Sequence, residues 1–92
     1  MLLKKIIEVL NEENIHLMHD DLDDDILGTF LSIDGLSIII VNASIIQNIR
    51  LYNTIVAEEI GHYFISKGNS IPYDTNLLQA DLSYEKEENK AL

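Results

Sequence analysis

The first thirteen residues alternate apolar and charged positions at helical spacing. The apolar positions are Leu2, Leu3, Ile6, Ile7 and Leu10. Because they recur every three to four residues, they predict an amphipathic helix over residues 2–13. Residues 15–18 then set His16 between apolar neighbours, which indicates a short edge strand.

A turn dipeptide divides the next apolar stretch into two halves. Residues 26–33 precede Asp34-Gly35, and residues 36–42, rich in β-branched side chains, follow it. An Asp-Gly pair between two such runs predicts a β-hairpin with a tight turn. Ser44, just after the second run, is the predicted cap of a short helical turn.

Residues 49–66 read as the central helix of the fold. They are apolar on almost every side, which is typical of a buried helix. Gly68, in the polar stretch that follows, is placed to supply a left-handed cap. A glycine inside a helix costs about 1 kcal/mol relative to alanine. We therefore expect Gly61 to admit another backbone, the hairpin, at close range.

The remaining residues complete the predicted architecture. Residues 70–80, which include Pro72, resemble a loop, and residues 81–92 form a charged segment of helical pattern. The expected fold is α+β, in one domain spanning residues 1–92. It consists of an N-terminal helix, a small antiparallel sheet, a buried central helix and a C-terminal helix.

Charge and composition restrict the possible partners and the compartment. The 92 residues carry a formal net charge of −10 and contain no cysteine. The charge argues against direct binding to nucleic acid or an anionic membrane. The lack of cysteine excludes disulfides and thiolate zinc sites. No apolar run resembles a signal peptide or a membrane span, so we expect a soluble cytoplasmic protein.

An acidic run lies between the predicted edge strand and the hairpin. Residues 20–25 include five aspartates, whose mutual repulsion favours a solvated loop. A calcium loop starting at Asp23 is the alternative. Gly28 and Asp34 then fall near the glycine and last-ligand positions of the EF-hand pattern, but Leu27 stands where that pattern needs a ligand.

Three ionisable residues lie within one turn of the central helix. Glu58 and His62 are four residues apart and share a face, whereas Glu59 lies about 100° around the helix from Glu58. An unpaired buried carboxylate costs several kcal/mol, on the order expected for buried charges. Either a bound metal ion or a cationic side chain would offset that cost.

The spacing is similar to the zincin motif His-Glu-x-x-His, in which two histidines hold zinc and the glutamate is the general base. In this chain Glu58 takes the first histidine position, Glu59 the base position and His62 the second ligand position. A carboxylate binds zinc at a similar distance to imidazole. It also adds negative charge, which makes the metal a weaker Lewis acid, so catalysis is affected more than binding.

The surrounding sequence resembles the ImmA/IrrE family of metallopeptidases from phages and mobile elements. Residues 51–63 read LYNTIVAEEIGHY, and members of that family often carry Ala-Glu-Glu-(Ile/Leu)-Gly-His at this point. Residues 38–42 fit the family's run before the helix. Glu88 fits its Glu-x-x-Ala pattern, with Glu85 and Glu87 as neighbouring candidates.

The resemblance implies a zincin-like fold, a zinc site and a regulatory role. Zinc would be held by Glu58, His62 and Glu88, and Glu59 would activate water. The expected partner is a helix-turn-helix repressor, which family members cleave or oppose. The family continues past its third ligand, so a chain ending at Leu92 is expected to be a C-terminally short member, with its oligomeric state open.

Other interpretations of the same residues stay open. Glu59 could support the helix or a ligand, Glu58 could pair with lysine or face water, and Glu88 could lie on a solvated helix. His16 and His19 are expected to be surface histidines, with a fourth metal ligand as the alternative. The chain is then either a metallopeptidase, a catalytically inactive binding module of the same fold, or an interaction protein unrelated to metal.

Overall fold

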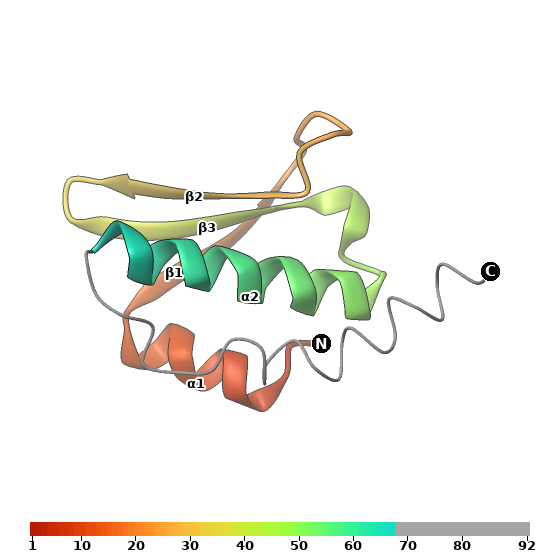
Figure 1. Cartoon of the computed structure of the whole chain (residues 1–92). Coiled ribbons are helices and arrows are strands. Elements are labelled where there is room, and N and C mark those ends of the chain that lie inside the picture. The colour runs from red at the N-terminus through yellow and green to blue at the C-terminus, as the bar shows by residue number, and fades with distance from the viewer. Residues whose placement is uncertain (68–92) are drawn as a thin grey trace.

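The computed structural model describes residues 1–67. The predicted loop over residues 70–80, the predicted helix over residues 81–92 and the candidate ligand Glu88 lie outside this range. The described elements are, in order, α1 (Lys4–Glu12), β1 (Ile15–Asp20), β2 (Gly28–Ile33), β3 (Leu36–Asn42), the 3-10 helix η1 (Ala43–Ile45) and α2 (Ile49–Ser66) (Figure 1). The α+β class is confirmed, and the two predicted helices that fall within residues 1–67 form close to their expected bounds.

The three strands form one sheet with the order β1-β3-β2. β2 and β3 are antiparallel, as the hairpin pattern predicts, but β1 pairs with β3 in parallel. The expectation of a wholly antiparallel sheet is therefore wrong. The chain reverses once after β1 and again in the hairpin, so β3 runs in the direction of β1. β1 lies at an edge, as expected.

The hairpin turn follows the sequence prediction closely. Ile33 pairs with Leu36, so only Asp34 and Gly35 lie in the turn. Both have positive φ, 50° at Asp34 and 81° at Gly35. Positive φ at both central residues is the feature that favours Asp-Gly in two-residue hairpins. The second strand ends at Asn42, also as expected.

Helices α1 and α2 pack on one side of the sheet, and no helix of residues 1–67 lies on the other side (Figure 1). α1 contacts β1 and α2, and α2 contacts β2 and β3. The core between them includes fully buried side chains from each layer, among them Ile6, Val9, Ile39, Val41, Val56 and Ile60. The apolar character of α2 thus reflects its position between α1 and the sheet. Within residues 1–67, no helix has the length and apolar character needed to cross a bilayer.

Asn42, at the end of β3, performs two structural tasks. Its side-chain oxygen accepts a hydrogen bond from the backbone nitrogen of Ser44 and so caps η1. The prediction that Ser44 is the cap is therefore wrong, because the asparagine two residues earlier takes the acceptor role. Its Nδ2 donates to the backbone carbonyls of Leu22, Asp23 and Ile26, at 3.0–3.2 Å. Asn42 thereby fixes the acidic loop that joins β1 to β2.

This acidic loop is the solvated segment that the aspartate run predicts. Asp23, Asp24 and Asp25 are all exposed. The residues at the EF-hand positions do not come together as a calcium loop in the structure. Gly28 begins β2, while Asp34 lies in the hairpin turn beyond the far end of that strand. The first and last positions of the calcium alternative are therefore separated by a whole strand.

Candidate functional site

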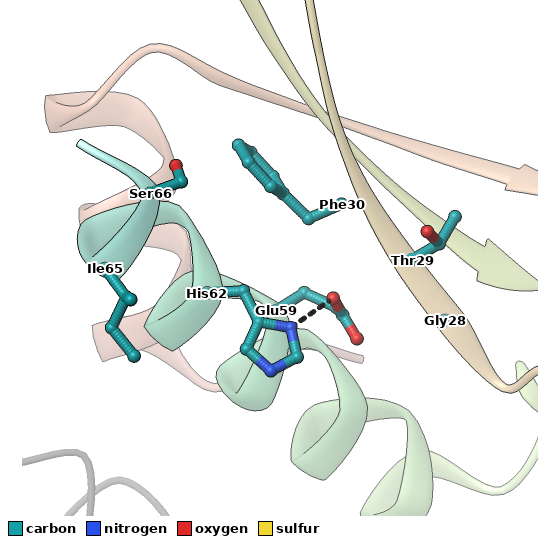
Figure 2. A pocket seen from close by; sticks show the side chains of 7 residues that line it. All are labelled: Gly28, Thr29, Phe30, Glu59, His62, Ile65 and Ser66. Carbon is teal, nitrogen blue, oxygen red and sulfur yellow. Dashed lines mark hydrogen bonds and ion pairs between the residues drawn. The ribbon is translucent and has the colours of Figure 1, made fainter. Parts of the chain in front are cut away.

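Helix α2 brings Glu59 and His62 together on the side that faces β2. Nδ1 of His62 and Oε1 of Glu59 are 3.0 Å apart. Glu59 is buried, with 7% of the residue exposed, whereas the His62 side chain is 64% exposed. The pair therefore joins a carboxylate in the protein interior to an imidazole at the surface (Figure 2).

A pocket of about 470 Å³ opens beside this pair, between β2 and the C-terminal half of α2. Its walls include Gly28, Thr29 and Phe30 from β2 and Glu59, His62 and Ile65 from α2. The ring of Phe30 packs edge-on against Tyr63, with 5.9 Å between ring centroids. Tyr63 in turn donates a hydrogen bond to Glu13 at 3.0 Å, so the apolar wall is anchored to the residue that follows α1.

Gly28 sets how closely β2 approaches α2 at this site. A Cβ atom at Gly28 would lie 2.4 Å from Cγ2 of Ile55 and 3.6 Å from Cγ of Glu59. Carbon atoms do not approach to 2.4 Å without displacement, so any larger residue would push the strand from the helix. The glycine thus permits the strand to cover Glu59.

The prediction that Gly61 admits the hairpin at close range is wrong. Among residues 1–67, a Cβ atom at Gly61 would meet nothing within 4 Å, so the hairpin does not approach the helix there. The close approach of hairpin and helix does occur, but the missing side chain is on the strand. Gly28 is the first residue of β2, and a glycine within a strand often marks a place where another part of the chain approaches closely.

The hydrogen bond of the pair determines which nitrogen of His62 is available. A carboxylate can only accept, so Nδ1 carries the proton that it donates to Glu59. In the neutral ring, Nε2 is then left with a lone pair. Figure 2 shows this second nitrogen pointing away from Glu59. This tautomer suits metal coordination, general-base chemistry or hydrogen-bond acceptance at Nε2.

The structure separates the two adjacent glutamates. Glu58 is exposed while Glu59 is buried, and Glu58 is not among the residues that line the pocket. Within residues 1–67, no three acidic or histidine side chains are grouped so that they could hold a metal ion. Of the predicted set, the described residues bring together Glu59 and His62, and the third predicted ligand, Glu88, lies outside them.

The sequence analysis did not predict a second side-chain contact of a histidine, between His19 of β1 and Tyr52 of α2. His19 Nε2 lies 2.7 Å from the hydroxyl oxygen of Tyr52, and burial raises the pKa of Tyr52 above its usual value. The strand alternation held a signal for this, since Ile15, Leu17 and His19 fall on one side of β1. His16 and His19 are both exposed, as expected, but His19 also contacts the helix layer through Tyr52, whereas His16 lies on the other side of β1.

Comparisons with protein-family models, with curated proteins and with solved structures found no match to this chain. The resemblance to the ImmA/IrrE family therefore remains a prediction from the motif in α2. The chemistry available to the site follows from the buried carboxylate, the exposed imidazole and the pocket beside them.

Proposed function

We propose that the chain is a metallopeptidase-like domain with a zincin-like arrangement, acting on a helix-turn-helix repressor of a phage or mobile element. The observation that carries the proposal is the hydrogen bond between buried Glu59 and exposed His62. It fixes the imidazole with Nε2 outward at the edge of a pocket. Histidines that bind metals usually donate their other ring nitrogen to a carboxylate or carbonyl in this way.

The donor set fits a metal ion in part. Nε2 of His62 is the imidazole ligand, Glu58 is an exposed carboxylate one turn before it, and Glu88 is the third ligand that the family resemblance implies. When bound, zinc would acidify a water molecule and polarise a peptide carbonyl. A set with one imidazole and two carboxylates is less selective for zinc than a two-histidine set.

Glu59 has two roles open to it within this proposal. Oε1 orients His62, and the same carboxylate lines the pocket, where it can accept a proton from water. Phe30 and Ile65 give the pocket an apolar part that suits an apolar substrate side chain. A repressor is a basic protein, which is electrostatically compatible with a chain of charge −10.

Metal retention tests the proposal directly. The untagged full chain is exposed to zinc and desalted, and its metal content is compared with that of His62→Ala and His16→Ala. His16 is also an exposed histidine, on β1 and outside the pocket. We expect about one zinc per chain in the wild type and in His16→Ala, and a loss in His62→Ala. Equal retention in both variants, or none in the wild type, overturns the metal site.

A Glu59→Gln variant separates the two roles of the carboxylate. If Glu59 mainly orients His62, zinc affinity falls by about 10- to 100-fold, the usual cost of losing such a partner. If it mainly accepts a proton, zinc stays bound while cleavage of a repressor encoded beside the gene falls by about 100-fold or more. Cleavage that persists in the variant would exclude the second role.

A non-catalytic regulatory module is the second candidate function. It is favoured by Glu58 at the position of the first zincin histidine and by its exposure outside the pocket lining. In that case the chain binds the repressor without cutting it. Co-purification of an intact repressor with both wild type and His62→Ala would support this candidate over the hydrolase.

A further inference from the structure

The side of the sheet opposite the helices carries a continuous apolar surface. Because side chains alternate along a strand, every second residue points to that side. We call this surface the outer face, and its apolar members are Met18 of β1, Leu31 and Ile33 of β2, and Leu36, Ile38 and Ile40 of β3. The strand register sets these residues side by side: Met18 pairs with Ile40, Leu31 with Ile38, and Ile33 with Leu36.

The alternate residues confirm this assignment, because they point to the helices. Phe30 packs against Tyr63 of α2, and His19 contacts Tyr52. Ile39, between the outward-pointing Ile38 and Ile40, is fully buried. The outer-face residues therefore lie on the side of the sheet that no helix of residues 1–67 covers (Figure 1).

Four of the six apolar residues of the outer face are exposed in the part of the chain that the structure describes, while Ile38 and Ile40 are half-buried. Met18, Ile33 and Leu36 are each 49–52% exposed, and Leu31 is 37% exposed. Single exposed apolar residues are ordinary, but a continuous set across three strands is typical of a binding surface.

An acidic rim borders one end of the outer face. Asn42 follows Ile38 and Ile40 in the outward set of β3, and its Nδ2 holds the carbonyls of Leu22, Asp23 and Ile26. The acidic loop therefore crosses the sheet on the outer side, and Figure 1 shows it projecting away from the helices. Its exposed aspartates stand at the end of the apolar surface, with Asp20 beside them at the end of β1.

The formal charges in and around the sheet are all negative. Residues 15–48, which contain all three strands and the acidic loop, include six aspartates and no lysine or arginine. The aspartates are Asp20, Asp21, Asp23, Asp24, Asp25 and Asp34. A negative rim attracts a partner of opposite charge and repels one of the same sign.

We propose that the outer face binds a protein partner through an apolar surface flanked by lysine or arginine. A second copy would set two aspartate rims against each other, which is unfavourable. Residues 68–92 carry five acidic and two basic residues, a net charge of −3. Their charge has the same sign as the rim, so they are not complementary to it either. An anionic membrane is disfavoured by the same repulsion. The surface lies across the sheet from the Glu59–His62 pair, so binding there needs no hydrolysis.

A defined probe tests the proposal with the full chain. The probe is a fluorescein-labelled 18-residue amphipathic helix of leucine and lysine, and the matched control is the same design with glutamate in place of lysine. Fluorescence anisotropy measures affinity, and methyl NMR spectra locate the binding. We expect the lysine probe alone to bind, with shifts at Ile33, Leu36 and Ile38 and not at Ile7 of α1.

Paired variants separate apolar contact from charge. Leu31→Thr/Ile33→Thr should weaken binding by about tenfold, since each loses apolar contact area but keeps strand propensity. The control Leu3→Gln/Ile7→Gln, which removes two similarly exposed residues, should bind as the wild type does. Asp24→Asn/Asp25→Asn should weaken binding by about threefold at low salt, more than Glu8→Gln/Glu12→Gln on α1.

Three outcomes would overturn the proposal. NMR shifts centred on α1 would place the binding site elsewhere. So would an equal loss of probe affinity in Leu31→Thr/Ile33→Thr and in Leu3→Gln/Ile7→Gln. A dimer in sedimentation that strengthens with salt and excludes the probe would identify a second copy as the occupant. Outer-face methyl groups that already contact residues 68–92 in the probe-free chain would identify that segment as the cover.

Discussion

Two buried asparagines hold chain segments that lie outside the regular elements. Asn53 accepts from the backbone nitrogen of Leu3 at 2.7 Å and donates to the carbonyl of Met1 at 3.0 Å. Asn42 does the same for the acidic loop and η1. An amide suits both positions because it donates and accepts at once, and each residue is at most 2% exposed.

The importance of Asn42 can be measured by truncation. In Asn42→Ala the hydrogen bonds to three loop carbonyls and to the Ser44 amide are lost, although the Asp23 carbonyl keeps its bond from the Ile26 nitrogen. We expect the free energy of unfolding to fall by about 2–3 kcal/mol. Asn48→Ala is the control, because it removes only the exposed cap of α2, at a cost of about 1 kcal/mol. Urea unfolding compares the two, and an equal loss would contradict the role of Asn42 in fixing the loop.

Tyr52 makes stability depend on alkaline pH. Burial raises its pKa in the folded chain, while the unfolded chain loses the phenol proton near pH 10, roughly the reference value. The folded state therefore holds the proton more tightly. The stabilisation is full below pH about 10 and is lost as the pH rises through the folded pKa.

We accordingly expect Tyr52→Phe to unfold with a shallower decline in stability above pH 10 than the wild type. Urea titrations at a series of pH values on either side of about 10, the reference pKa of tyrosine, provide the measurement. Tyr63→Phe controls for the loss of a buried hydroxyl at the other end of α2. A decline in Tyr52→Phe as steep as that of the wild type would show that Tyr52 does not contribute.

At the scale of elements, the two glycines near the helix–strand contact have opposite roles. Gly28→Ala should destabilise the fold by about 1–3 kcal/mol, because its Cβ overlaps Ile55 and forces β2 away. Gly61→Ala should stabilise it by about 1 kcal/mol, since the helix gains propensity in open space. Urea unfolding checks both signs.

Ile55, the residue that a Cβ atom at Gly28 would meet, offers a further control on the contact between β2 and α2. Ile55→Leu removes the Cγ2 atom that a new Cβ would meet, so it should restore part of the stability lost in Gly28→Ala. Leucine fills a similar volume, so the single variant should cost less than about 1.5 kcal/mol. Additive losses in the double variant would place the strain of Gly28→Ala elsewhere.

Local patterns were sufficient to predict most elements but not their pairing. The Asp-Gly turn and the apolar run of α2 identify the hairpin and the central helix within two residues of their observed bounds. The parallel pairing of β1 was missed, because a single strand pattern carries no direction. The Glu59–His62 pair follows from helical spacing, whereas its cover by Gly28 depends on a contact between distant segments.

At the scale of the whole molecule, the sheet separates two kinds of chemistry. The helix side holds the Glu59–His62 pair and its pocket, and the other side presents the outer face with its acidic rim. Net charge in the sequence indicated acidity but not its location. The aspartate run predicts a solvated loop, but its place beside the outer face depends on the hydrogen bonds by which Asn42 holds the loop across the sheet.

The parallel pairing of β1 with β3 also has a consequence for the order of folding. Ile15 pairs with Ser37 across 22 positions of sequence, whereas the hairpin closes over two residues. Long loops cost more entropy to close than short ones, and such distant contacts slow folding. We therefore expect the hairpin to form early and β1 to join it afterwards, bringing α1 against α2 in the same late step.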